Sequence, residues 1–288
     1  MVIVGSSVVV AKIIVADFPI FLANELRFLI AASILVPLYL LTNDGLPQYS
    51  KRDTAILASQ AFTGVFLFNV LLFYGIQFTN AAEAGIITST TPAFVAVIAV
   101  VFLNDQLTRN TVLGVSFTVL GILAIEVLGS GSGVGRGPNP LFGNFLIFGA
   151  VLGEALFTIL GKAVSDRISP LEITTAASVF GVLLFLPFAL YELTWFDVGT
   201  VPAVAWIPIV YYGVVVTVVA FMLWFRGVAM VPASTAGVFT GMLPVSAVLL
   251  SYLLLGEPFL WSHVVGIICV VAGIVHASRI VRNTGDSE

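Results

Sequence analysis

One stretch of this chain is written twice. Residues 68–126 align without gaps with residues 220–278, 152 positions later. Among the identities that return are Phe73, Gly75, Ala84, Gly85, Thr88, Pro92, Leu103, Gly114, Gly121 and Ile122, as Phe225, Gly227, Ala236, Gly237, Thr240, Pro244, Leu255, Gly266, Gly273 and Ile274. Lys12 and Pro37 also return, as Lys162 and Pro187, 150 positions later. A hydrophobic chain with two copies of one unit is typical of repeat-built membrane transporters.

Composition places the chain in a lipid bilayer. It is 59% hydrophobic and 9% charged, with a mean hydropathy of +1.13, whereas soluble domains carry about 25% charged residues. The net charge of −4 comes with no basic stripe for nucleic acid. A single cysteine, Cys269, excludes an internal disulfide and a cysteine-based metal cluster. The two histidines, His263 and His276, lack ligand-spaced partners, so we expect neither metal nor cofactor.

Apolar runs separated by polar or Pro/Gly-rich gaps predict an all-α protein with ten transmembrane helices. The runs are too long, and alternate too little, for the strands of a membrane barrel. The expected helices are 1–16, 19–42, 54–77, 81–103, 110–128, 142–164, 170–191, 203–228, 232–254 and 260–281. We expect a first repeat over 1–128, a Gly/Ser/Pro-rich linker over 129–140, a second repeat over 141–282 and a tail over 283–288.

The two halves are expected to be inverted, because five helices per half bring the second half into the membrane from the opposite side. Positive charges collect on the cytoplasmic side of membrane proteins. With the N-terminus inside, that side holds Lys51, Arg52, Arg109, Lys162, Arg167, Arg226, Arg279 and Arg282. The outer side holds Arg136. Both termini and the tail are therefore predicted to be cytoplasmic.

The first apolar stretch, residues 1–15, is shorter than the roughly 20 residues of a membrane-spanning helix. It lacks the basic region and small-residue cleavage site of a signal peptide. We therefore expect the chain to begin inside its first helix.

The string AGVFTGMLPVSAVLLSYLLLGEP at 236–258 and its partner AGIITSTTPAFVAVIAVVFLNDQ at 84–106 resemble the EamA repeat of the drug/metabolite transporter superfamily. Gly5-Ser6-Ser7 with Lys12, and Leu26-Arg27-Phe28, resemble the start of the same domain, although Val4 stands where a tryptophan is usual. The resemblance covers nearly the whole chain. It implies a ten-helix exporter of small metabolites in the bacterial inner membrane, most similar to the exporters of aromatic amino acids.

Two prolines fall about half-way along equivalent helices. Proline interrupts a helix and frees the carbonyl four residues back, which is Thr88 for Pro92 and Thr240 for Pro244. Such carbonyls are tolerated in a membrane where protein, water or a ligand satisfies them. We therefore predict that Thr88 and Thr240 line a substrate cavity and that Pro92, Pro244, Gly85 and Gly237 act as hinges. The alternative is a structural kink whose carbonyls bond to threonine hydroxyls.

One carboxylate lies near the centre of a predicted span. An ionisable residue at such depth is functional by default, so Glu154 is predicted to receive a substrate ammonium or a proton. The alternative is a protonated acid bonded to a neighbouring helix. Lys162 and its repeat partner Lys12 are expected at opposite mouths of one path, where they attract a carboxylate or, alternatively, extend to the lipid headgroups.

Aromatic residues predict a pocket. Phe62, Phe66, Asn69 and Phe73 follow one face of a helix, with Tyr74 adjacent, and Tyr211 and Tyr212 lie deep in another span. Asn69, Tyr74, Tyr211 and Tyr212 are therefore predicted to bind an amphipathic aromatic solute. For most of the phenylalanines, lipid contact or core packing is the better explanation.

The leading hypothesis is an alternating-access carrier whose partners are a small-molecule substrate and the bilayer. We expect a monomer, because no dimer signal is visible, and no powering by ATP within the chain, because there is no P-loop. The alternative cargo of such a carrier is a drug, a nucleoside or another metabolite. A lipid-modifying membrane enzyme would need clustered acids or histidines, and a channel would need a continuous polar lining. Neither pattern is present.

Overall fold

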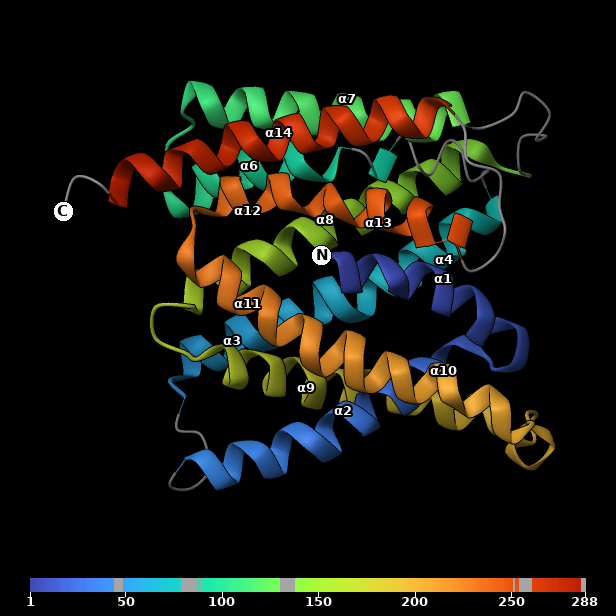
Figure 1. Ribbon diagram of the computed structural model, residues 1–288. Helices are drawn as coiled ribbons and strands as arrows, with labels where there is room; N and C mark the ends of the chain where they lie inside the picture. Colours follow the sequence, from blue (N-terminus) through green and yellow to red (C-terminus); the bar gives the residue numbers. More distant parts are fainter. Residues whose placement is uncertain are drawn as a thin grey trace.

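The computed structural model describes residues 1–43, 49–78, 87–88, 90–129, 138–250, 252–253 and 261–285. Regular structure in these ranges is helical throughout, and the helices run alongside one another in one bundle (Figure 1). The α-helices are α1 (Val2–Asp17), α2 (Ile20–Thr42), α3 (Lys51–Gln60), α4 (Phe68–Phe78), α6 (Thr91–Leu103), α7 (Arg109–Gly129), α8 (Pro140–Val164), α9 (Pro170–Glu192), α10 (Trp206–Tyr211), α11 (Phe221–Met230), α12 (Ala233–Thr240), α13 (Met242–Leu250) and α14 (Trp261–Gly285). Their limits follow the apolar runs of the sequence to within a few residues, apart from the interruptions described below.

Among the described residues, five helical segments are long and apolar enough to cross a membrane. They are Ile20–Thr42, Lys51–Gly75, Pro140–Val164, Pro170–Glu192 and Ala203–Met230. Shorter apolar helices occupy Thr91–Leu103, Arg109–Ala124 and His263–His276. An all-helical protein was predicted and is found in the described residues.

Two of the long segments widen into π-helix at matching places. η1 (Ala61–Leu67) joins α3 to α4, and η4 (Tyr212–Ala220) joins α10 to α11. η1 and η4 are equivalent in the repeat, because the positions 152 residues after η1 fall within η4. In η1 the carbonyl of Thr63 accepts from the amide of Phe68, five residues on. This carbonyl faces Gly153 of α8, where a Cβ would lie 2.5 Å from it. A glycine therefore gives the widened turn room against the next helix.

Helices from the two halves pack against their repeat partners. α7 lies along α14 and α2 along α9 (Figure 1), while α6 packs along α12, which precedes its own repeat partner α13 in the chain. In the first pair a Cβ on Gly121 would lie 2.7 Å from the carbonyl of Gly266, and a Cβ on Gly273 would lie 2.7 Å from that of Gly114. These glycines allow close backbone approach. They are the regularly spaced glycines of the repeat, here facing one another.

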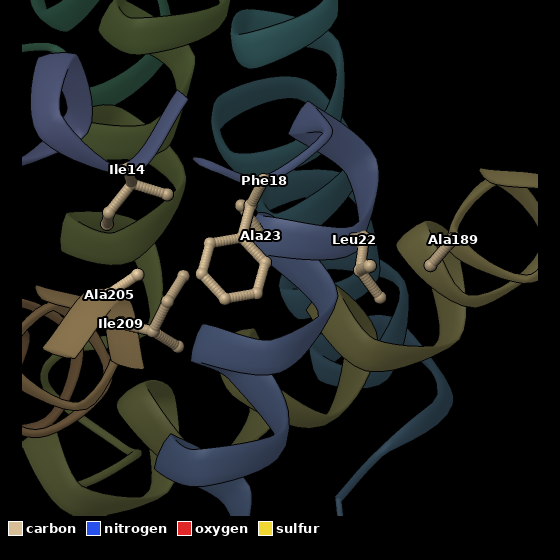
Figure 2. Close-up of a cluster of buried hydrophobic side chains, with 7 residues drawn as sticks. All are labelled: Ile14, Phe18, Leu22, Ala23, Ala189, Ala205 and Ile209. Carbon is tan, nitrogen blue, oxygen red and sulfur yellow. The ribbon is translucent and has the colours of Figure 1, made fainter. Parts of the chain in front are cut away.

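A cluster of buried apolar side chains closes the bundle where α1 ends and α2 begins (Figure 2). It also receives residues from the end of α9, from the 3₁₀ turn η3 (Ala203–Ala205) and from α10. Its members are Ile14, Phe18, Leu22, Ala23, Ala189, Ala205 and Ile209. The ring of Phe18 meets Trp206 edge-on, with centroids 5.2 Å apart. We call this end of the bundle the α1–α2 end.

Candidate functional site

The helix before Pro92 is interrupted. Residues 87–88 are helical, Thr90 forms a turn, and α6 begins at Thr91 with Pro92 as its second residue. Proline fits a first turn, where its missing N–H has no partner to lose. The carbonyls before the break accept bonds from side-chain hydroxyls: Thr90 Oγ1 donates to Ile87 O over 2.5 Å, and Thr91 Oγ1 to Thr88 O over 2.9 Å. At this break, threonine hydroxyls therefore satisfy the carbonyls of Ile87 and Thr88.

A second interruption lies at the equivalent place in the other half. α12 ends at Thr240, Gly241 forms a turn, and α13 begins at Met242. The hydroxyl of Thr240 donates to Gly237 O over 2.6 Å, and the amide of Gly241 bonds to Val238 O over 3.2 Å. Pro244 is the third residue of α13, and its side chain lies outside the description.

The two interrupted helices touch at a glycine. A Cβ on Gly237 of α12 would lie 2.8 Å from the Cβ of Val95 and 3.4 Å from the carbonyl of Pro92, both on α6. Of the four predicted hinge residues, Pro92 and Gly237 are therefore neighbours. Gly85, the repeat partner of Gly237, lies outside the described residues. The hinge role of all four remains a prediction.

Glu154 contacts the first break. It is the fifteenth of the 25 residues of α8, about 21 Å from the start of that helix at 1.5 Å per residue. The side chain is partly buried, and its Oε2 lies 3.1 Å from Thr91 Oγ1. No cation of the described residues lies within 4.0 Å of this carboxyl group. A carboxyl group in an apolar bundle without a cation is suited to bind one or to hold a proton.

A small pocket opens near the α1–α2 end. Its volume is about 120 Å³, and its walls come from α2, α4 and α9. The lining residues are Ile20, Phe21, Asn69, Val70, Phe73, Tyr74, Gln77, Phe185 and Glu192. Asn69 and Tyr74, predicted to bind substrate, lie here together, and the Asn69 amide donates to Val65 O over 2.5 Å. The volume is well below the roughly 300 Å³ of the smallest drug-sized sites, so the pocket suits one end of a solute.

Glu192 brings a carboxylate to this pocket. It is the last residue of α9, its side chain is 8% exposed, and its Oε2 accepts from the amide of Leu22 over 2.7 Å. It therefore caps the first turn of α2, where backbone N–H groups have no partner within the helix. Sequence reasoning missed Glu192, because at the end of an apolar run it resembled an ordinary membrane-surface residue.

The two tyrosines deep in one predicted span, Tyr211 and Tyr212, contact different residues. Tyr211 lies 2.8 Å from the Ser6 hydroxyl, and Ser6 itself donates to Ile3 O over 2.6 Å. Since the serine hydrogen is engaged, Tyr211 is the donor and joins α10 to α1. The ring of Tyr212 lies 4.7 Å from the guanidinium carbon of Arg27, which also stacks on Phe28 at 4.3 Å.

The burial of two charged residues on α2 was not predicted. Glu25 and Arg27 are only 3% and 6% exposed. Both carboxylate oxygens of Glu25 and the Nε of Arg27 are buried without a hydrogen-bond partner. Both can be buried although they are two residues apart on the helix, because α2 packs against α9 and against η4.

Lys162 stands apart from these groups. Lys162 Nζ donates to Ala229 O over 3.0 Å, one residue before the end of α11. A cation there satisfies a terminal carbonyl and complements the helix dipole. Lys12 lies on α1, and its side chain is outside the description.

The predicted site residues thus form separate groups rather than one cluster: the Glu154 break, the pocket, the Tyr211–Ser6 pair and the Lys162 cap. Within the ranges that can be described, no three His, Cys, Asp or Glu side chains gather as a metal site would need.

Comparison with known proteins identifies the family. The sequence model of the EamA-like transporter family matches residues 1–127 and 141–279. The Bacillus subtilis (strain 168) protein named uncharacterized transporter YetK is 48% identical, over 95% of this chain and 83% of its own length. A probable terminal-alkyne amino-acid exporter of Streptantibioticus cattleyicolor is 25% identical, over 82% of this chain and 76% of its own. A solved crystal structure with 18% identity superposes with a TM-score of 0.81, over 96% of this chain and 95% of that one, which shows a shared fold. The chain therefore belongs to the EamA-like transporter family and is a multi-pass membrane protein.

Proposed function

We propose that the protein is a secondary transporter that exports small amine-bearing metabolites, with aromatic or neutral amino acids as the first candidates. It would act by alternating access in the bacterial inner (plasma) membrane. Glu154 carries this proposal: it is a carboxyl group within an apolar helix, in contact with a helix break and with no cation of the described residues beside it. A carboxylate in this position is suited to the ammonium group that amino acids share.

Inverted halves are supported by the glycine contacts of α7 and α14. Gly121 meets Gly266 and Gly114 meets Gly273, so the pairing runs antiparallel and each contact is the repeat image of the other. Other contacts are exchanged in the same way: α1 packs on α13 as α8 packs on α6, and α2 packs on η4 as α9 packs on η1. With five spans in each half, we expect ten spans with both termini on the same side, and the positive charges favour the cytoplasmic side. Alternating access commonly uses such paired halves.

Two features support the choice of an amino acid. The relative from Streptantibioticus cattleyicolor is named as an amino-acid exporter. The pocket of Asn69 and Tyr74 offers aromatic walls with an amide and a carboxylate, the composition that suits the ring end of an amphipathic solute. A drug, a nucleoside or another metabolite is the alternative cargo. The pocket and Lys162 stay candidate contacts along the path.

Transport in proteoliposomes tests the proposal. Labelled phenylalanine and leucine should enter protein-containing vesicles with saturation, and each should compete with the other. Glu154→Gln should reduce the rate about tenfold or more, since a charged hydrogen bond to the ammonium is lost. Asp166→Asn, which removes the same charge from an exposed turn, is the matched control. Flux that never saturates would indicate a channel, and full activity of Glu154→Gln would exclude the proposed site.

A further inference from the structure

One hydroxyl at the first break faces two acceptors. Thr91 Oγ1 lies 2.9 Å from Thr88 O and 3.1 Å from Glu154 Oε2. A threonine hydroxyl carries a single hydrogen and two lone pairs. It therefore cannot donate to the carbonyl and to the carboxyl group at the same time. Thr91 is buried, with 3% of its side chain exposed, so water has little access to replace either bond.

The charge of Glu154 decides which bond forms. A protonated Glu154 donates to Thr91 Oγ1, and Thr91 in turn donates to Thr88 O, so that both bonds form in one chain. An ionised Glu154 can only accept, and a carboxylate competes strongly because a bond to a charged acceptor is about twice as strong as a neutral one. The Thr91 hydrogen then turns to Glu154, and the bond to Thr88 O is lost.

The second break has no such arrangement. Leu243 stands at the repeat position of Thr91, and Val4 stands at that of Glu154. There the hydroxyl of Thr240 donates to Gly237 O, within its own helix. Both members of the Glu154–Thr91 pair are thus replaced by apolar residues at the second break. The chain therefore contains its own comparison between a break beside an acid and a break without one.

Other titratable groups do not explain this contact. The elements packed against α8 are α3, η1, α4, α6, α11 and α12. Their titratable side chains are Lys51, Arg52 and Asp53 on α3, Tyr74 on α4 and Arg226 on α11. α6, α12 and η1 carry none, and α8 itself adds Lys162, which bonds to Ala229 O. In the part of the chain described, Asp53 pairs with Arg167, and Glu154 has no ionic partner.

We propose that Thr91 transmits the charge state of Glu154 to the helix break between Thr88 and Pro92. When Glu154 releases its proton to water, Thr91 turns from the Thr88 carbonyl to the carboxylate and the break loosens. One Glu154 oxygen and the Thr88 carbonyl then form a two-oxygen site for the cargo's ammonium. Thr91 is thus a positioning residue that acts through Glu154. The identity of the cargo rests on the proposed function, whereas the hydrogen-bond exchange does not.

Hydrogen exchange without cargo tests the link directly. Amide exchange is followed by mass spectrometry in detergent between pH 5 and pH 9, for peptides covering residues 87–95 and, as internal reference, residues 238–246. After correction for the intrinsic pH dependence, exchange at the first break relative to the second should rise roughly three- to tenfold with pH, as expected for the loss of one hydrogen bond. Thr91→Val and Glu154→Gln should abolish this rise. Thr91→Ser keeps the hydroxyl and should restore it.

Transport then separates the two proposals. In proteoliposomes the KM for an amino acid should fall as pH rises in the wild type and in Thr91→Ser, and it should fall less in Thr91→Val, where the charge of Glu154 changes but the Thr91 hydroxyl no longer responds to it. If Thr91→Val and Glu154→Gln exchange with the wild-type pH response, the link through Thr91 is overturned whatever the cargo. If exchange behaves as expected while no amine is carried, the link stands and the assigned cargo is overturned.

Discussion

Single hydroxyl groups join segments that are far apart in the sequence. The bond from Tyr211 to Ser6 spans 205 residues and fastens α10 to α1. We expect Tyr211→Phe to lower stability by about 0.5–1 kcal/mol, because polar bonds between membrane helices are individually modest. Thermal unfolding in detergent of Tyr211→Phe, Ser6→Ala and the double variant gives the coupling energy. Tyr191→Phe, which removes an exposed hydroxyl, is the control. Additive effects of the two single changes would contradict the bond.

The carboxylate of Glu192 makes a second long-range contact, with the first turn of α2. Glu192→Ala leaves the Leu22 amide without this acceptor, so we expect a loss of about 1–2 kcal/mol, as for a removed helix cap. Glu192→Gln keeps an acceptor oxygen without the charge and should fall between the wild type and Glu192→Ala. Thermal unfolding in detergent measures both. Equal stability of Glu192→Ala and the wild type would show that the cap contributes nothing.

Some of the residues that make these long-range contacts could be identified from the sequence, and others could not. Glu154 and Tyr211 were predicted to need partners, because an ionisable or hydroxyl group inside an apolar run is conspicuous by itself. Thr91 and Glu192 were missed, because their importance comes from Glu154 and Leu22, 63 and 170 residues away. Periodicity within one helix carries no information on which side chain of another helix it meets.

At the scale of helices, the contact between α6 and α12 depends on one glycine. Gly237→Ala would place a methyl group 2.8 Å from Val95, so α12 must move away from α6. We expect a loss of about 1–3 kcal/mol, typical of overpacking, together with slower transport. Gly227→Ala is the matched control, since nothing lies within 4 Å of its new Cβ, and it should be neutral or stabilising. Equal behaviour of the two variants in unfolding and proteoliposome uptake would remove Gly237 from the hinge.

Helix positions were predictable where composition alone determines them, and helix interiors were not. The apolar runs gave the limits of α2, α8 and α9 to within two residues. Nothing in the run over 54–77 indicated the π-helix η1, because no proline or charged residue marks it. Such a widened turn depends on what packs beside it, here Gly153 of α8. Its recurrence at η4 shows that the two repeats share this feature despite different side chains.

For the whole molecule, the inverted relation of the halves makes a prediction about sidedness. Arg52 and Val204 are equivalent under the offset of 152, both are exposed, and each is the second residue of a long apolar segment. If the halves are inverted, these two positions lie on opposite sides of the membrane. The positive charges near Arg52 place it in the cytoplasm, and Val204 then faces outward.

Cysteine labelling decides between inverted and parallel halves. Cys269 is the chain's one cysteine, so Cys269→Ser gives a background without thiols. In that background, Val204→Cys should react with a membrane-impermeant maleimide added to intact cells, whereas Arg52→Cys should react only after permeabilisation. The unsubstituted background should stay unlabelled in both conditions. Labelling of both cysteines from the same side would mean that the repeat is parallel. The reciprocal contacts of Gly121 with Gly266 and of Gly114 with Gly273 would then need another explanation, because antiparallel pairing of repeat-related helices requires the two halves to point in opposite directions.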